Sequence, residues 1–100
     1  MGYPGPMGHQ NLYEVLSGAL DDGTERGIRP GSHVLVEEGQ VPLEAGAVYL
    51  VEVQGGLHLR EARWEGAWRF VPWNEGYPAF PLEAVRVVAR VRGVVQYDPL

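Results

Sequence analysis

The chain of 100 residues contains no lysine, and all eight of its basic residues are arginines. A lysine amine can become neutral when burial lowers its pKa, whereas an arginine guanidinium keeps its proton and only donates hydrogen bonds. Chemistry that needs a neutral lysine amine as its general base is therefore excluded.

Cysteine is also absent, which excludes disulfides, zinc–thiolate centres and a cysteine nucleophile. No apolar run approaches the roughly 20 residues that a membrane-spanning helix needs. Residues 1–8 have neither the basic nor the apolar segment of a signal peptide. We therefore expect no membrane association and a cytoplasmic location.

Positive charge is scarce, because 13 acidic residues outnumber the arginines and give a net charge of −5. This balance opposes strong binding to nucleic acid or to anionic membranes, since both require basic surface. A hydrophobic content of 45% with 21% charged residues is typical of a folded domain. We expect one β domain at residues 12–100, preceded by a flexible arm rich in Gly and Pro at residues 1–11.

Short runs of β-branched and aromatic residues separated by Gly and Pro predict an all-β fold, either a small barrel or a curved antiparallel sheet. Gly55-Gly56 and Glu65-Gly66 are the expected tight turns of a β-meander. A long polar loop is expected at residues 17–31, and one helical turn near residues 82–84. The strands are expected at residues 12–16, 34–36, 47–54, 57–64, 67–73 and 85–95.

The final strand has the clearest pattern. Val85, Val87, Ala89 and Val91 are expected to point one way and Arg86, Arg90 and Arg92 the other, which predicts a strand with one buried face. Gly93 predicts a bulge or bend. The arginines of the other face (Arg86, Arg90 and Arg92) are expected to pair with glutamates across strands, although a phosphate-binding stripe is an alternative.

Three ordered segments resemble the peptidase domain of LexA-type and phage cI-type repressors, a fold shared with bacterial signal peptidases. Residues 28–36 and 43–51 are similar to two stretches in which a Gly-Asp pair leads into a strand. Residues 69–77 are similar to a strand that ends in a Pro-x-Asn-x-x-Tyr loop. The resemblance implies curved, barrel-like antiparallel sheets, a serine–lysine peptidase site and a homodimer.

The sequence departs from this family at its chemical positions. The resemblance places the nucleophilic serine at Gly23 or, with a short insertion, near Leu20, and it places the lysine at Arg60. Ser32 and Ala47 replace the acidic members of the two Gly-Asp pairs. The chain therefore resembles an inactive member of the family, with no catalytic residues and no cofactor.

Other residues offer weaker candidates for chemistry. Thr24 or Ser17 with His58 as the base would make an altered peptidase, although His58 is more simply explained as a half-exposed strand residue. A zinc site built from His9, His33 and His58 lacks short ligand spacing, so no metal is expected.

The aromatic residues Trp64, Trp68, Trp73, Tyr77 and Phe80 could stack bases in a small nucleic-acid- or peptide-binding module, but core or interface positions explain them better.

The expected function is self-association or protein-partner binding by a non-catalytic LexA/cI-like domain, with a role in transcriptional regulation as one setting. No helix-turn-helix segment precedes residue 12, so we do not expect a complete repressor. For a homodimer, we expect the contact to involve residues 85–97, with Arg90 and Arg92 pairing across the two-fold axis.

Overall fold

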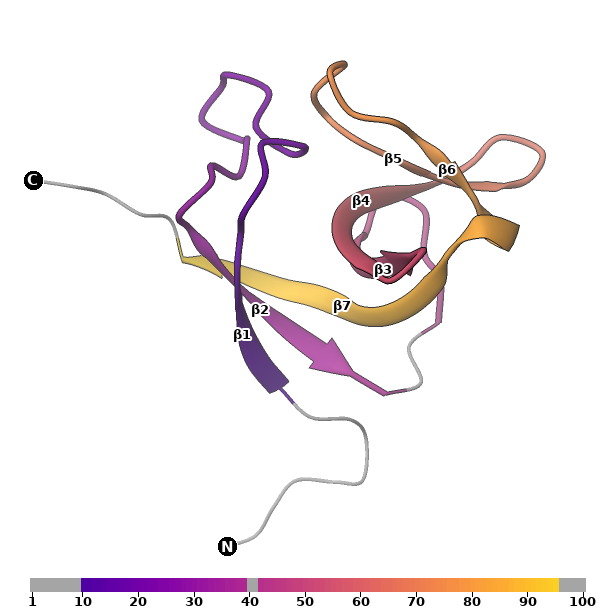
Figure 1. Ribbon diagram of the computed structural model, residues 1–100, viewed down its shortest axis with the longest axis horizontal. Helices are drawn as coiled ribbons and strands as arrows, with labels where there is room; N and C mark the ends of the chain where they lie inside the picture. Colours follow the sequence, from indigo (N-terminus) through magenta and orange to yellow (C-terminus); the bar gives the residue numbers. More distant parts are fainter. Residues whose placement is uncertain (1–9, 40–41, 96–100) are drawn as a thin grey trace, which may run out of the picture.

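The computed structural model describes residues 10–39 and 42–95 and shows an all-β protein with 50% of these described residues in strands. The only helical element among the described residues is the 3-10 turn η1 (Leu82–Ala84), where the sequence predicts a helical turn. No helix of the described chain has the length and apolar character to cross a membrane. The strands are β1 (Gln10–Glu14), β2 (His33–Glu38), β3 (Val48–Val53), β4 (Gly56–Trp64), β5 (Trp68–Val71), β6 (Phe80–Pro81) and β7 (Arg86–Val95) (Figure 1).

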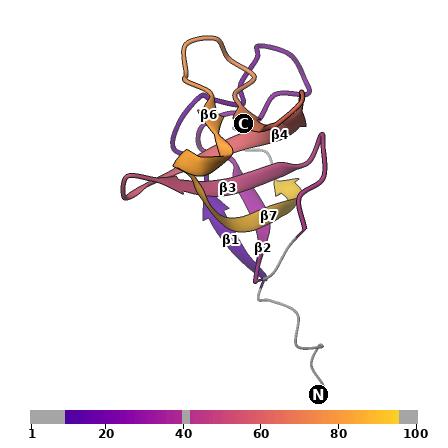
Figure 2. The same cartoon turned by 90° about the vertical axis from the view of Figure 1, so that its right-hand side faces the viewer.

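The seven strands form one antiparallel sheet in the order β1-β2-β7-β3-β4-β5-β6. The predicted meander is confirmed, since β3, β4 and β5 are consecutive neighbours. The sheet is strongly curved, with β3 lying between β4 and β7 (Figure 2). It does not close into a barrel, so the curved sheet, and not the small barrel, is the form that the chain adopts.

Both predicted turns differ from the observed ones by one residue. The first hairpin turns at Gln54-Gly55, with φ values of 51° and 86°, and Gly56 already pairs with Val53. Two positive φ values are the signature of a type I′ turn, and glutamine tolerates the first position because the β3–β4 register is fixed by packing. The second turn has three residues, since Trp64 pairs with Trp68 across Glu65-Gly66-Ala67.

The strand β7 carries two bulges, which correct the prediction of a single buried face. The register shifts opposite Leu50/Val51 and again opposite Leu35/Val36, next to the predicted break at Gly93. Each extra residue reverses the direction of the side chains that follow it. Val87 therefore packs against one core cluster, whereas Ala89 belongs to the other.

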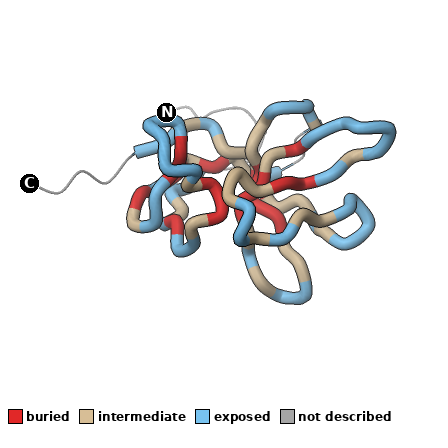
Figure 3. Tube along the Cα trace, turned by 90° about the horizontal axis from the view of Figure 1, so that it is seen from above, coloured by how far each residue is buried: buried red, intermediate tan, exposed pale blue. Residues whose placement is uncertain are grey.

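The two clusters lie on opposite faces of the curved sheet's central strands. Leu59 of β4 belongs to the first cluster, together with Leu20 and Ile28 of the long loop. The second cluster contains Tyr49, Val51, Ala62 and Phe70. Buried residues lie in the interior of the fold, while the tips of the loops are exposed (Figure 3). Since Leu59 and Arg60 are successive strand residues, they face different clusters.

The ends of the predicted domain differ slightly from the expectation. β1 begins at Gln10, so the last two residues of the expected arm belong to the sheet. Residues 1–9 and Tyr97 lie outside the described residues. The strands at the two ends of the sheet order are β1 and β6, whereas β7 lies between β2 and β3. Among the described residues, the stretch of β7 beyond Arg90 has no strand partner on the side of β3, so an edge contact of the final strand would have to use this stretch.

Candidate functional site

The position that the resemblance assigns to lysine is occupied by a buried arginine. The Arg60 residue is 1% exposed. Its Nε donates to the Pro78 carbonyl oxygen at 3.0 Å, and one terminal nitrogen donates to the Leu59 carbonyl oxygen at 2.8 Å. The guanidinium carbon lies 4.9 Å from the centre of the Phe80 ring and 5.9 Å from that of Tyr77. Within the described chain no carboxylate pairs with it.

This arrangement defines what Arg60 can do. Burial lowers the pKa of its guanidinium, and the interaction with Tyr77 partly opposes this shift. Arginine nevertheless keeps its proton in proteins. Arg60 is thus a fixed cation that ties β4 to the loop after β5 through Pro78. It cannot accept a proton from a hydroxyl.

The candidate serine positions carry no nucleophile. Gly23 is exposed in a turn with φ of +83°, and Leu20 is buried in the cluster of Leu59. Because Arg60 faces the other side of β4, the Leu20 side chain and the Arg60 side chain do not point into a common space.

Thr24 has a hydroxyl, but local hydrogen bonds occupy it. Its Oγ1 donates to Asp22 Oδ1 at 2.7 Å and accepts the Arg26 N–H at 3.1 Å. The Thr24 side-chain and backbone hydrogen bonds hold the pKa of the Asp22 carboxyl below its usual value. The hydroxyl of Ser17 accepts the Ala19 N–H at 3.4 Å.

His58 stands apart from these hydroxyls. Its ring lies 5.2 Å from the Phe80 ring, and no hydrogen bond joins it to Thr24 or Ser17. Burial, followed by the charge of Arg60, lowers the pKa of the His58 imidazole. His9 is outside the described residues, and no group of three potential metal ligands occurs within residues 10–39 and 42–95.

The Pro-x-Asn-x-x-Tyr loop has a role that the sequence alone did not indicate. Asn74 Nδ2 donates to the carbonyl oxygens of Gly18 at 3.3 Å and Asp21 at 3.2 Å. The Tyr77 hydroxyl accepts a hydrogen bond from the backbone N–H of Gly18 at 3.0 Å, and the backbone N–H of Trp73 donates to the Ala19 carbonyl oxygen at 2.8 Å. Two loops far apart in sequence are thereby joined, with the segment from Gly18 to Asp21 held against Asn74 and Tyr77.

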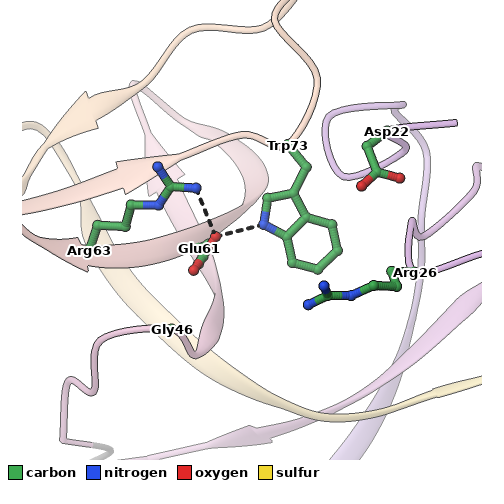
Figure 4. Close-up of a pocket in the computed structure, with 6 residues that line it drawn as sticks. All are labelled: Asp22, Arg26, Gly46, Glu61, Arg63 and Trp73. Atoms are coloured by element: carbon green, nitrogen blue, oxygen red, sulfur yellow. Dashed lines mark hydrogen bonds and ion pairs between the residues drawn. The ribbon is translucent and has the colours of Figure 1, made fainter. Parts of the chain in front are cut away.

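The described surface is hollowed around Trp73. Three adjoining pockets of about 330, 540 and 450 Å³ share this residue, and we call them together the Trp73 groove. Trp73 Nε1 donates to Glu61 Oε1 at 2.8 Å, and Arg63 pairs with the same oxygen at 3.4 Å. Figure 4 shows the indole between this pair and the side chains of Asp22 and Arg26. Sequence reasoning missed this groove because its walls come from five separate segments.

The arginine row of β7 is paired within the chain, as the sequence predicts. Arg86 pairs with Glu52 at 2.7 Å and Arg92 with Glu37 at 2.6 Å. Arg90 pairs with Glu44. The two candidate interface residues, Arg90 and Arg92, therefore already have carboxylate partners in their own chain.

Most of the candidate base-stacking aromatics contribute to packing. Trp73 packs against the first cluster, while Trp68 and Phe80 pack against the second. Tyr77 binds the Gly18 N–H, as described above. Trp64 is the exception: it is 58% exposed at the tip of the β4–β5 hairpin.

No protein-family model matches the sequence, and no curated protein matches it.

Proposed function

We propose that this chain is a non-catalytic domain similar to the peptidase domain of LexA/cI-type repressors, and that it acts by binding other proteins. Local structure at the matching positions supports the resemblance. Gly31 and Gly46 have φ values of +91° and +93°, and each lies two residues before a strand, β2 or β3. Only glycine adopts this conformation without strain, which explains why glycine occurs at both turns.

The observation that carries the proposal is the state of Arg60. A buried cation that donates to two carbonyl oxygens is a structural group, and it has no lone pair with which to activate a hydroxyl. The described chain offers a curved sheet with a groove, and binding is the activity that such a surface supports. Regulation of transcription in the cytoplasm is the setting that the family resemblance suggests.

A hydroxyl-reactive fluorophosphonate probe tests the proposal against the altered-peptidase alternative. We expect no covalent labelling over a pH range that includes alkaline conditions. Labelling of Thr24 or Ser17 that is lost in His58→Gln would contradict the proposal, because it would demonstrate an activated nucleophile. The variant His33→Gln, which changes an exposed histidine of β2, is the matched control.

Self-association through β1 is a second candidate function, favoured by its position. No described strand pairs with the outer edge of β1, and its central residue Leu12 is 64% exposed. Two copies paired antiparallel about Leu12 would place Gln10 opposite Glu14, which avoids facing like charges.

Sedimentation at micromolar concentration tests this dimer. We expect a species of twice 11.0 kDa that Leu12→Glu dissociates. Leu57→Glu on β4, which also changes an exposed leucine, should leave the dimer intact. A wild-type monomer would reject the dimer, and a dimer unaffected by Leu12→Glu would place its interface elsewhere.

A further inference from the structure

One stretch of β7 lacks a strand neighbour on one side. β2 pairs with residues 89–95 of β7, whereas β3 pairs only with residues 86–90. Beyond Arg90, the side of β7 that faces the start of β3 therefore has no strand partner within residues 10–39 and 42–95. An unpaired strand edge presents a row of backbone donors and acceptors that can pair with an added extended chain.

The Trp73 groove runs along this free edge. One pocket of the groove, with a volume of about 450 Å³, is lined by residues 90–94 of β7. The other walls of this pocket come from the start of β3, the long loop and Trp73. Ile28, Val48 and Val91 give it an apolar lining. Four residues of an extended chain span roughly 13 Å, so the free edge matches a short peptide segment.

The charge of this part of the groove is unlike that of the whole protein. Arg26, Arg90 and Arg92 line it, and no described carboxylate does. Arg90 Nε is buried and has no hydrogen-bond partner among the described residues. The guanidinium of Arg26 likewise forms no ion pair there. Arg90 and Arg92 pair with Glu44 and Glu37, so Arg26 is the cation of this part of the groove that has no carboxylate partner among the described residues. On a chain with a net charge of −5, an unpaired guanidinium beside an apolar lining is complementary to an anionic ligand.

We propose that this groove binds an extended, acidic peptide segment of a partner protein. The peptide backbone pairs with the free edge of β7 at residues 91–94, and its apolar side chains contact Trp73 and Val91. Its carboxylates bind the Arg26 guanidinium. The strand edge favours a peptide over a nucleic acid, because a phosphodiester backbone has no amide groups for ladder pairing. The inference rests on the proposed binding function and adds its site and ligand class.

The binding experiment uses a fluorescent hexapeptide of alternating glutamate and valine, titrated with the whole chain and followed by anisotropy. We expect the peptide to bind and the matched lysine–valine peptide to bind at least about tenfold more weakly, the difference of one charge-assisted hydrogen bond. Arg26→Gln should weaken the acidic peptide by a similar factor. Arg69→Gln, which removes an exposed arginine of β5 outside the groove, should change nothing.

Backbone pairing is tested by modifying the peptide instead of the protein, so the test does not depend on whether a protein variant folds. An acidic peptide methylated on alternate amide nitrogens should lose binding, and the unmodified peptide should slow amide exchange at residues 91–94. Three results would overturn the proposal: equal binding of the acidic and basic peptides, an affinity for the acidic peptide that Arg26→Gln leaves unchanged, or full binding of the methylated peptide. Preferential binding of a single-stranded oligothymidylate at the same residues would do the same. Binding of a second copy of the chain in the groove would also overturn it, and this would be detected as self-association that the peptide inhibits by competition.

The two proposals fail separately. Absence of peptide binding, with no fluorophosphonate labelling, removes the groove proposal and leaves the non-catalytic function. Labelling of a hydroxyl removes the non-catalytic function whether or not the peptide binds.

Discussion

Replacing Arg60 with lysine is the most informative single change, because it restores the residue type that the family resemblance requires. A lysine at this buried position either stays charged, at the same cost of burying a cation, or loses its proton and donates only the weaker hydrogen bonds of a neutral amine. A lysine ammonium lacks the planar fork that reaches two carbonyl oxygens at once. At least one of the bonds to Pro78 and Leu59 is then lost, together with stacking on Phe80.

The expected magnitude follows from these contacts. A hydrogen bond from a charged donor contributes about 1.5–3 kcal/mol, and a partly desolvated cation–π contact contributes about 0.5–2 kcal/mol. We expect Arg60→Lys to lower the free energy of unfolding by about 2–4 kcal/mol. With a urea m-value of about 1 kcal/mol/M for a domain of this size, the midpoint should fall by about 2 M or more.

Urea denaturation followed by tryptophan fluorescence measures the change, with the exposed Arg69→Lys as the control. A midpoint for Arg60→Lys that matches the control would refute the reasoning, since it would show that the guanidinium contacts do not stabilise the fold. The same variant should also remain free of self-cleavage, because Leu20 and residue 60 face opposite sides of β4. Specific fragments from Arg60→Lys would contradict that arrangement.

Three further predictions concern dynamics, ligands and pH. Amide exchange should be fast at the exposed residues 22–26, between the buried Leu20 and Ile28, and slow in the middle of β7; equal protection in both would be contrary to expectation. Duplex DNA should bind weakly, because the net charge of −5 opposes phosphate neutralisation; a salt-dependent nanomolar Kd would overturn this. The pKa of His58 lies below its ordinary value of 6.5 in the fold, so the unfolded chain takes up more protons as the pH falls. Stability should therefore be complete above about pH 6.5 and decline below it, and His58→Gln should flatten this decline in thermal melts, whereas His33→Gln should retain it.

Local patterns in the sequence predict most of the fold. β-branched runs and Gly-rich turns locate six of the seven strands, and they also identify the meander. The alternation of β7 predicts a buried strand, but the sequence does not show that bulges at two points redirect its side chains to different clusters. Strand β6 is missed because it has only two residues and contains Pro81.

The candidate site is less predictable, because long-range contacts create it. The sequence identifies Arg60 as an unusual residue, but its burial depends on Pro78 and Phe80 from a different segment. The Trp73 groove combines the long loop, the start of β3 and the end of β7. The motif Pro72-Trp73-Asn74 was the available signal, since a tryptophan in an irregular polar loop needs a packing partner.

The intact mass of the purified chain, followed over days at neutral and alkaline pH, tests the central claim most directly. A lysine-dependent peptidase of the family that the chain resembles would cleave faster as its amine loses a proton. A domain whose corresponding residue is the buried, permanently charged Arg60 should keep a single mass at every pH. A pair of complementary fragments that forms more quickly at alkaline pH, and that is absent in Thr24→Val, would contradict the non-catalytic account.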